Sequence, residues 1–388
     1  MKLKSKNKPR LLVMADWFAP AFKAGGPVQS VVNFAEYASR WYDVFVFTGD
    51  RDLGELQSMN GITTNSWVKY KDVAQVYYAT PQNQKYGSVL TVIKELDPDY
   101  VYCNSMFSTA FAVYPMMLKR LFDFRAKLVL APRGMLKSSA LAFKPVKKKL
   151  FLRIIRLMGI PSKITFHATD INEEQNIRQL FGQVDVIRAA NIPGNVPDEI
   201  YPVKKDPGGL SIIFIGRIHP VKNLKFLLDL LGSVKGQIKL TIVGLPEDRG
   251  YVNICRQLIN SFPERIKVEF AGELPHNITS EKLRQHHILV SPTLGENFGH
   301  AIFESLSMGK PVLISDQTPW RNLEVKNAGW DLSLTNPEAF INVLNNFVGM
   351  DQREYENYAR GAFNFVKEYL SANDPMSAYF KLFPINEN

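Results

Sequence analysis

The sequence predicts an α/β fold with two doubly wound domains, and three observations lead to this prediction. The chain has 388 residues, about twice the length of a typical domain. Short apolar runs rich in β-branched residues alternate with amphipathic segments through both halves, which is typical of parallel sheets covered by helices on both faces. Proline and glycine gather between residues 192 and 209, after the first set of runs. We therefore expect the domain boundary there.

The first half contains short apolar strands, each followed by a helix or a loop. Strands are expected at residues 11–14, 44–48, 76–79, 100–103 and 128–130, and helices at residues 28–39 and 90–96. Sheets of this type bind ligands at the carboxyl ends of their strands. The loops that follow these strands are therefore where functional residues are expected.

The second half repeats the alternation. Strands are expected at residues 211–215, 239–243, 268–271, 288–291 and 311–314, and helices at residues 224–231, 252–261 and 301–308. An aromatic-rich tail that looks helical runs from about residue 355 to residue 383.

Composition favours a protein of the cytosol, where cysteines stay reduced. Hydrophobic residues make up 46% of the chain, which is enough to bury a full core. The apolar run at residues 11–15 ends at Asp16, too early for a signal peptide, and no run reaches the roughly 20 residues of a membrane span. Cys103 and Cys255 show no metal-type spacing.

The formal net charge of +10 is concentrated in residues 119–163, where thirteen Lys and Arg stand against one acidic residue, Asp123. Such a concentration indicates an anionic partner. Two interpretations of the basic helix at its centre are open: it lies on an anionic membrane, or it packs on its own domain with a solvated basic face. Nucleic acid is not expected, because no stacking aromatics or known motif accompany the charge. The cations of this helix are Lys144, Lys147, Lys148, Lys149, Arg153 and Arg156.

The most informative segment is residues 295–304, which carries Glu296 and Glu304 eight residues apart across a glycine-bracketed turn. The turn follows an expected strand and opens an expected helix. Backbone N–H groups and a partial positive charge at such a helix start suit a phosphate. The two carboxylates can accept hydrogen bonds from sugar or ribose hydroxyls.

A second segment follows the strand expected at residues 211–215. There Gly216 and Arg217 are followed at five residues by Lys222. Two cations placed beyond a glycine can reach both phosphates of a nucleoside diphosphate and stabilise the charge that grows on a leaving group. The alternative is a solvated loop without a ligand.

The two segments, with Glu-x7-Glu inside ENFGHAIFESLSMGKPV and a Gly-Arg followed by Lys, resemble the signatures of glycosyltransferase family 4. The likeness extends to residues 16–26 and 132–134 and so covers most of the chain. Glycosyltransferase family 4 consists of retaining nucleotide-sugar glycosyltransferases with the GT-B fold, and its bacterial surface-polysaccharide members resemble this chain. The resemblance implies an acceptor-binding domain at residues 1–195, a nucleotide-sugar domain at 196–365, and a helix at 366–388 that returns to the first domain.

The resemblance also implies roles for residues of the second domain. Glu296 would contact the donor sugar, Glu304 the ribose, and Arg217 and Lys222 the diphosphate. Backbone groups along the turn would face the sugar and the diphosphate, where small residues permit close approach. The donor-binding positions of this turn are Asn297, Phe298, Gly299 and His300, with Gly216 in the earlier segment.

In the first half, Gly25 and Gly26 precede an expected helix and would let the backbone approach a phosphate or a sugar ring. Asp16, Arg133 and His167 follow or end strands and are candidates for acceptor or phosphate binding. A flexible loop, a surface arginine and a core histidine are the respective alternatives for the glycines, Arg133 and His167. Many relatives have a histidine near residue 131, where this chain has alanine.

The sequence thus predicts a retaining hexosyltransferase that moves a sugar from a UDP- or GDP-sugar to a hydroxyl of a saccharide acceptor. The basic segment suggests that the acceptor is lipid-linked and that the enzyme is peripheral on the inner face of the cytoplasmic membrane. No cofactor and no metal are expected, because no Asp-x-Asp stands at a donor position. A nucleotide-sugar epimerase, a phosphorylase and a non-catalytic or membrane-recruited scaffold are the alternatives.

Overall fold

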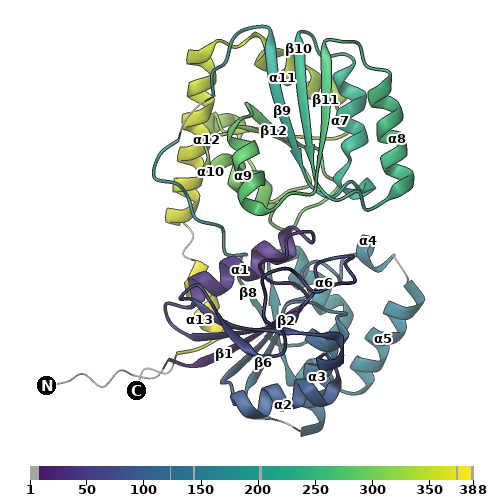
Figure 1. The fold of residues 1–388 in the computed structure, drawn as a ribbon, viewed down its shortest axis with the longest axis vertical. Helices are drawn as coiled ribbons and strands as arrows, with labels where there is room; N and C mark the ends of the chain where they lie inside the picture. Colours follow the sequence, from purple (N-terminus) through teal and green to yellow (C-terminus); the bar gives the residue numbers. More distant parts are fainter. Residues whose placement is uncertain (1–7, 123, 143–144, 201–202, 373–374, 386–388) are drawn as a thin grey trace, which may run out of the picture. The chain divides into compact units, whose positions relative to one another are not determined.

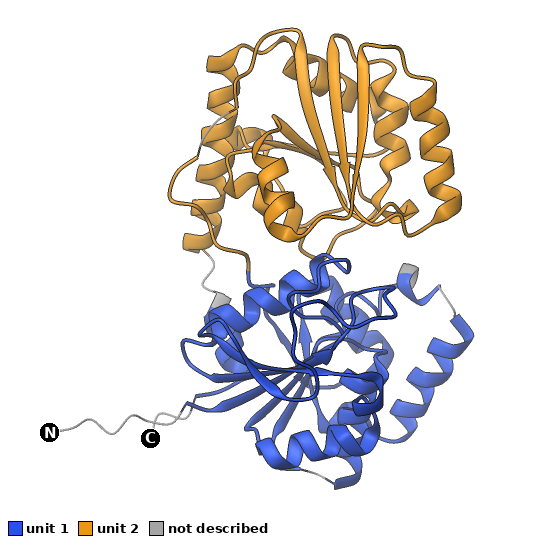
Figure 2. Cartoon of the chain, in the orientation of Figure 1, with its two compact units in different colours: residues 1–192, 374–388 blue, residues 193–373 orange. Residues whose placement is uncertain are grey.

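The computed structural model describes residues 8–122, 124–142, 145–200, 203–372 and 375–385. The chain divides into two compact units, residues 1–192 with 374–388 and residues 193–373 (Figure 2). The sequence predicted boundaries after residues 195 and 365. The second boundary lies further along the chain, because the helix that contains residue 366 continues to Ala372 within unit 2.

Unit 1 is built on an eight-stranded sheet in the order β3-β4-β2-β1-β5-β6-β7-β8 (Figure 1). Only β3 runs antiparallel to its neighbour. The strands are β1 (Arg10–Ala15), β2 (Asp43–Gly49), β3 (Trp67–Tyr70), β4 (Ala74–Ala79), β5 (Tyr100–Cys103), β6 (Lys127–Leu130), β7 (Thr165–Ala168) and β8 (Val186–Arg188). The helices are α1 (Gly26–Ala38), α2 (Tyr86–Leu96), α3 (Tyr114–Phe122), α4 (Ser138–Leu141), α5 (Pro145–Leu157), α6 (Ile171–Phe181) and α13 (Pro375–Leu382).

Unit 2 is built on a six-stranded parallel sheet in the order β11-β10-β9-β12-β13-β14. Its strands are β9 (Gly209–Ile215), β10 (Gln237–Val243), β11 (Ile266–Gly272), β12 (Ile288–Ser291), β13 (Val312–Ser315) and β14 (Gly329–Leu332). Its helices are α7 (Leu224–Leu231), α8 (Arg249–Asn260), α9 (His276–Arg284), α10 (His300–Ser307), α11 (Pro337–Gly349) and α12 (Gln352–Ala372).

The strands read as continuous apolar runs because helices cover both faces of each sheet. Successive residues of β1 illustrate this: Leu11 and Val13 belong to one hydrophobic core of unit 1, whereas Leu12 and Met14 belong to the other. Side chains alternate between the two faces of a strand, so each apolar run serves two cores at once. The predicted doubly wound α/β fold is confirmed.

The predicted return of the C-terminal segment to the first domain is also confirmed. Helix α13 belongs to unit 1, where Tyr379 and Phe383 are fully buried in the same core as Phe34. The ring centroids of Phe34 and Tyr379 are 5.2 Å apart. The Tyr42 hydroxyl donates a hydrogen bond of 2.5 Å to the carbonyl of Phe383. No helix in the described part of the chain is long and apolar enough to cross a membrane.

Candidate active site

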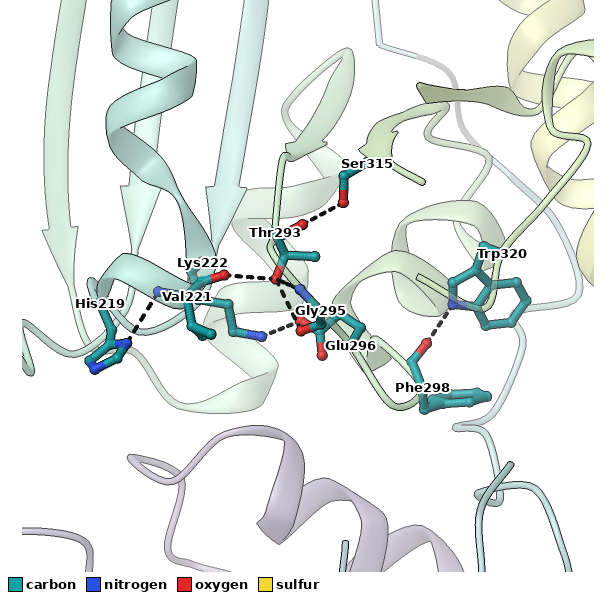
Figure 3. Close-up of polar contacts among 9 residues, drawn as sticks. All are labelled: His219, Val221, Lys222, Thr293, Gly295, Glu296, Phe298, Ser315 and Trp320. Atoms are coloured by element: carbon teal, nitrogen blue, oxygen red, sulfur yellow. Dashed lines mark hydrogen bonds and ion pairs between the residues drawn. The ribbon is translucent and has the colours of Figure 1, made fainter. Parts of the chain in front are cut away.

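The strand order of unit 2 creates a switch point between β9 and β12. From β9 the chain proceeds outward to β10 and β11, and it then returns to the other side of β9 with β12. The loops after β9 and β12 therefore leave the sheet in opposite directions, and the carboxyl edge between them is the usual ligand position in such folds. The two segments singled out in the sequence lie in these loops, and the second continues into the first turn of α10. Figure 3 shows Lys222 and Glu296 from the two segments.

Thr293 joins the two loops and was not predicted as a site residue. Its Oγ1 donates to the carbonyl of Val221 at 3.1 Å, and the amide of Leu294 donates to the same carbonyl at 2.8 Å (Figure 3). The carbonyl of Thr293 accepts a hydrogen bond of 2.5 Å from Ser315, at the end of β13. These bonds fix the loop after β12 against the loop after β9.

Lys222 and Glu296, 74 residues apart in sequence, form an ion pair across these loops (Figure 3). Each side chain is 19% exposed, so the pair is shielded but can still be reached from solvent. The amide of Glu296 donates to the carbonyl of Gln317 at 3.1 Å, which fixes the backbone below the carboxylate. The structure therefore brings together the predicted cation of one segment and the predicted carboxylate of the other.

Arg217 has a different partner. Its guanidinium NH1 donates to both carboxylate oxygens of Glu247, at 2.8 and 3.0 Å. This pair is exposed, at 40% for Arg217 and 36% for Glu247. Glu247 follows β10, and the loops after β9 and β10 approach closely: a Cβ on Gly244, at φ +152°, would lie 2.0 Å from the carbonyl oxygen of Gly216. Only glycine fits there.

Trp320 binds the turn before α10. Its indole N–H donates to the carbonyl of Phe298 at 2.5 Å, and the Phe298 ring is buried against it with centroids 5.3 Å apart (Figure 3). Gly299 has φ +79° and caps α10, while Asn297 and His300 are half-buried. Because the Phe298 side chain belongs to the core, only its backbone is available to a ligand.

Glu304 lies one turn into α10 and has a partner that the sequence did not suggest. Its Oε1 is 2.9 Å from Nε2 of His276, the first residue of α9. The carboxylate is thus tied to the loop that follows β11. In the part of the chain that the structure describes, no group of three or more His, Cys, Asp or Glu side chains could hold a metal.

The site candidates of unit 1 lie at the carboxyl edge of its own sheet. Gly25 and Gly26 are exposed at the start of α1, where Gly25 has φ +63°. Asp16 follows β1 and accepts a hydrogen bond of 2.7 Å from the Ser108 hydroxyl. Burial raises the pKa of the Asp16 carboxyl above its ordinary value.

His167 is a core histidine in this structure. It is fully buried, with Nδ1 2.7 Å from the Tyr102 hydroxyl and Nε2 2.7 Å from the carbonyl of Ala189. Burial, assisted by the positive charge of Arg133, lowers its pKa to about 3, so the ring is neutral at physiological pH. With both ring nitrogens bonded to the protein, it is not placed to bind an acceptor.

Arg133 is also held by the protein itself. Its guanidinium donates to Oδ1 of Asn104 at 2.6 Å, to the Tyr102 hydroxyl at 2.8 Å and to Oδ1 of Asn191. The residue therefore joins the ends of β5 and β6 to the segment after β8. This arrangement explains Arg133 structurally, and neither a phosphate role nor a solvated surface position is needed.

The cations of the predicted basic helix fall into three groups. Lys147, Lys149, Arg153 and Arg156 are exposed on α5. Lys148 is half-buried, and its Nζ donates to the carbonyl of Ala140 at 2.7 Å. Lys144 lies outside the described residues.

Residues 197–363 match the family model described as glycosyl transferases group 1. A stretch of 165 residues is 24% identical to D-inositol 3-phosphate glycosyltransferase of Rhodococcus erythropolis and covers 38% of this chain and 37% of that protein. Another, of 120 residues, is 29% identical to phosphatidyl-myo-inositol mannosyltransferase of Mycobacterium leprae and covers 30% of each. The chain thus matches about a third of the length of these curated relatives.

Solved structures match nearly the whole chain. Sucrose-phosphate synthase from Thermosynechococcus elongatus superposes with a TM-score of 0.70 at 14% identity, over 97% of this chain and 99% of that one. Anabaena HepE in complex with UDP-glucose gives 0.65 at 15% identity, over 97% and 100%. WaaG, a glycosyltransferase involved in lipopolysaccharide biosynthesis, gives 0.64 at 16% identity, over 96% and 98%.

Proposed function

We propose that this chain, which has the GT-B fold and belongs to the glycosyl transferases group 1 through residues 197–363, is a retaining, metal-independent glycosyltransferase. Its donor in this proposal is a UDP- or GDP-sugar that carries a hexose. Its acceptor is a hydroxyl of a lipid-linked saccharide in polysaccharide biosynthesis. We place it in the cytoplasm, as a peripheral protein of the inner membrane face.

The observation that carries the proposal is the Lys222–Glu296 pair at the switch point of unit 2. A cation and a carboxylate from two loops meet where doubly wound sheets bind ligands, with Arg217 in the loop that supplies Lys222. In the proposal, Lys222 and Arg217 bind the diphosphate of the donor. Arg217 then exchanges Glu247 for a phosphate, which is feasible because that ion pair is exposed.

The carboxylates bind the neutral parts of the donor. Glu296 accepts hydrogen bonds from hydroxyls of the sugar, and Glu304 accepts them from the ribose after His276 gives way. The backbone amides at residues 298–300 face the sugar and the diphosphate at the start of α10, where the helix dipole favours negative charge. Each group therefore has a partner of matching chemistry on the donor.

Catalysis in this proposal is front-face displacement. The bond between the anomeric carbon and the diphosphate oxygen breaks while the acceptor oxygen bonds to the same face of that carbon. The acceptor proton passes to an oxygen of the departing diphosphate, which serves as the base. Negative charge grows on the diphosphate only as the bond breaks, so Lys222 and Arg217 stabilise the transition state more than the ground state.

The comparisons support the choice of donor and acceptor class. HepE, a structural neighbour, was solved with UDP-glucose, which favours a nucleotide-sugar donor. The mannosyltransferase relative is named for a phosphatidyl-inositol acceptor, and WaaG for lipopolysaccharide biosynthesis. Both names refer to a molecule that contains a lipid, which supports a lipid-linked acceptor.

The experiment that tests the proposal is a donor screen with EDTA present. UDP-, GDP-, ADP- and TDP-sugars are added to the protein, and the thermal shift and the slow hydrolysis of each donor are measured. We expect a selective shift and release of one nucleoside diphosphate. NMR of the released sugar then gives its anomeric configuration, which the proposal requires to be that of the donor.

Three outcomes would overturn parts of the proposal. Binding of a donor that is never consumed, even with saccharide acceptors supplied, would favour a scaffold. Conversion of the donor to another nucleotide-sugar would favour an epimerase. Loss of hydrolysis in EDTA, restored by a divalent cation, would contradict metal independence.

A further inference from the structure

Helix α5 has two apolar faces, and only one of them is covered. Phe151, Leu152 and Ile155 pack into a core of unit 1, with the rings of Phe151 and Phe107 at 5.6 Å. The opposite face carries four aliphatic side chains that lie in solvent. Their exposed fractions are 78% for Val146, 58% for Leu150, 45% for Ile154 and 78% for Leu157.

These four residues form one continuous row, which we call the aliphatic stripe. At 3.6 residues per turn, positions 146, 150, 154 and 157 lie within about 80° of each other around the helix axis. Figure 1 shows α5 at the margin of unit 1. An amphipathic helix of a globular protein has one apolar face for its core, so the stripe is additional to what folding needs.

Cations border the aliphatic stripe on both sides. By the same helical spacing, Lys147 lies next to the stripe on one side of the helix. Arg153, Lys149 and Arg156 lie on the other side, between the stripe and the buried face. Within the described residues, none of these four exposed side chains forms an ion pair. Lys148, in contrast, points to the protein: its Nζ lies 5.2 Å from the ring centroid of Phe107.

Two further exposed apolar residues lie close to one end of the stripe. Leu121 and Phe122, at the end of α3, are 58% and 54% exposed. The neighbouring Arg120 donates from Nε to the carbonyl of Met158 at 2.8 Å, and Met158 directly follows Leu157. The exposed apolar residues of α3 and α5 thus belong to adjoining parts of the surface.

We propose that α5 is a membrane-docking helix that inserts its aliphatic stripe into an anionic lipid bilayer. Helices that lie in the membrane interface bury an apolar face at the boundary of headgroups and acyl chains, while flanking Lys and Arg contact lipid phosphates. The charges on both sides of the stripe argue for this occupant, because an anionic bilayer offers apolar depth and negative charge at one surface. This inference rests on the peripheral location in the proposed function and deepens it by naming the surface that contacts the membrane. The donor screen tests the glycosyltransferase activity separately from the vesicle assay.

The test is co-sedimentation of the whole chain with vesicles, without donor or acceptor. Vesicles of phosphatidylglycerol and phosphatidylcholine provide the anionic surface, and pure phosphatidylcholine provides the neutral one. We expect binding to the anionic vesicles. Changing Lys147, Lys149, Arg153 and Arg156 to Glu should weaken that binding at least about tenfold, since each cation contributes near an anionic surface. Changing Leu150, Ile154 and Leu157 to Gln should weaken it similarly, with all charges kept.

Each variant has a matched control. Lys235, Lys239, Lys267 and Arg353 are exposed cations of unit 2, and changing them to Glu alters the net charge equally. Leu56, Ile254 and Ile278 are exposed aliphatic residues outside the stripe, and changing them to Gln removes the same kind of surface. Both controls should bind vesicles as the wild type does. Donor hydrolysis and circular dichroism show separately whether each variant keeps its site and its fold.

Several results would overturn the proposal. The wild type could fail to sediment with anionic vesicles, or the four-Glu variant could bind as strongly as its control. Vesicle binding that persists in the Leu150, Ile154 and Leu157 variant would show that the stripe stays outside the bilayer. A wild-type dimer that this variant converts to a monomer, without vesicle binding by either, would assign the stripe to contact between two copies of the chain.

Discussion

Both units carry titratable residues near the carboxyl ends of their strands, but these residues have different partners. In unit 2, Lys222 and Glu296 pair with each other while staying within reach of solvent. In unit 1, Arg133 and His167 bond to the interior of their own unit, and His167 is fully buried. The position in the fold is thus the same, but burial decides which residues can meet a ligand.

The strongest test of this contrast is the removal of the cation at the switch point of unit 2. Lys222→Ala should lower kcat/KM for the donor about 10²- to 10³-fold, as loss of one group that stabilises a transition-state charge does in other enzymes. The melting temperature should stay near that of the wild type, because the side chain is partly exposed. Glu296→Gln should behave alike. Donor turnover that is unchanged in either variant would contradict the site.

The opposite outcome is expected in unit 1. His167→Ala should destabilise the protein by about 2–4 kcal/mol, because it leaves a cavity and removes partners from the Tyr102 hydroxyl and the Ala189 carbonyl. Urea denaturation followed by circular dichroism measures this change. At a temperature where the variant is folded, its kcat/KM should match the wild type. A folded variant of normal stability that loses activity would show that His167 takes part in ligand binding.

Acid should affect both units through buried histidines. The pKa of His167 is lowered to about 3 and that of His287 to about 4, in both cases first by burial, against an ordinary value of 6.5. Unfolded chains therefore bind more protons than folded ones below pH 6.5, and stability falls as the pH drops. Each group contributes a slope of up to about 1.4 kcal/mol per pH unit.

This pH dependence can be assigned to a unit by substitution. Between pH 6 and pH 5, His167→Gln should show a shallower loss of urea stability than the wild type, because glutamine does not titrate. The same substitution at His287 should reduce the slope through unit 2, because burial also lowers the pKa of that ring. Equal slopes for wild type and His167→Gln would mean that His167 is not kept neutral by the fold.

The smallest effect is expected at the Arg217–Glu247 pair. Glu247→Gln frees Arg217 from a competing carboxylate, so a nucleoside diphosphate should bind more tightly. The pair is exposed and worth at most about 1 kcal/mol, which limits the gain to about fivefold. Calorimetry with UDP and GDP measures it, and Glu269→Gln, which removes a similar surface pair with Lys282, is the control. Weaker binding by Glu247→Gln would show that Glu247 supports the site instead of competing for Arg217.

Much of this architecture could be predicted from the sequence, because parallel strands covered on both faces are continuous apolar runs. The strands around β1 and β9 were expected within a few residues. The strands β3, β8 and β14 were not, since they are short and partly exposed and so lack a clear run. Strand order, which creates the switch points, does not follow from local pattern at all.

The residues of the candidate site were likewise only partly predictable from the sequence. Lys222 and Glu296 were singled out through their motifs, and the fold joins them in an ion pair. Their roles toward a ligand stay a prediction. Glu247, His276 and Thr293 were missed because their roles arise from loops that only the folded sheet brings together. The burial of His167 depends on Tyr102 and on Tyr379, which arrives from a helix more than two hundred residues later in the chain.

That late arrival has a consequence for how the protein is made. Residues 193–373 are contiguous, so unit 2 can complete its core without any later segment of the chain. Unit 1 starts first but lacks Tyr379 and Phe383 until α13 leaves the ribosome. A nascent or truncated chain that ends before residue 374 would therefore expose the aromatic core around Phe34, so chaperones would be needed longest for the half that is translated first.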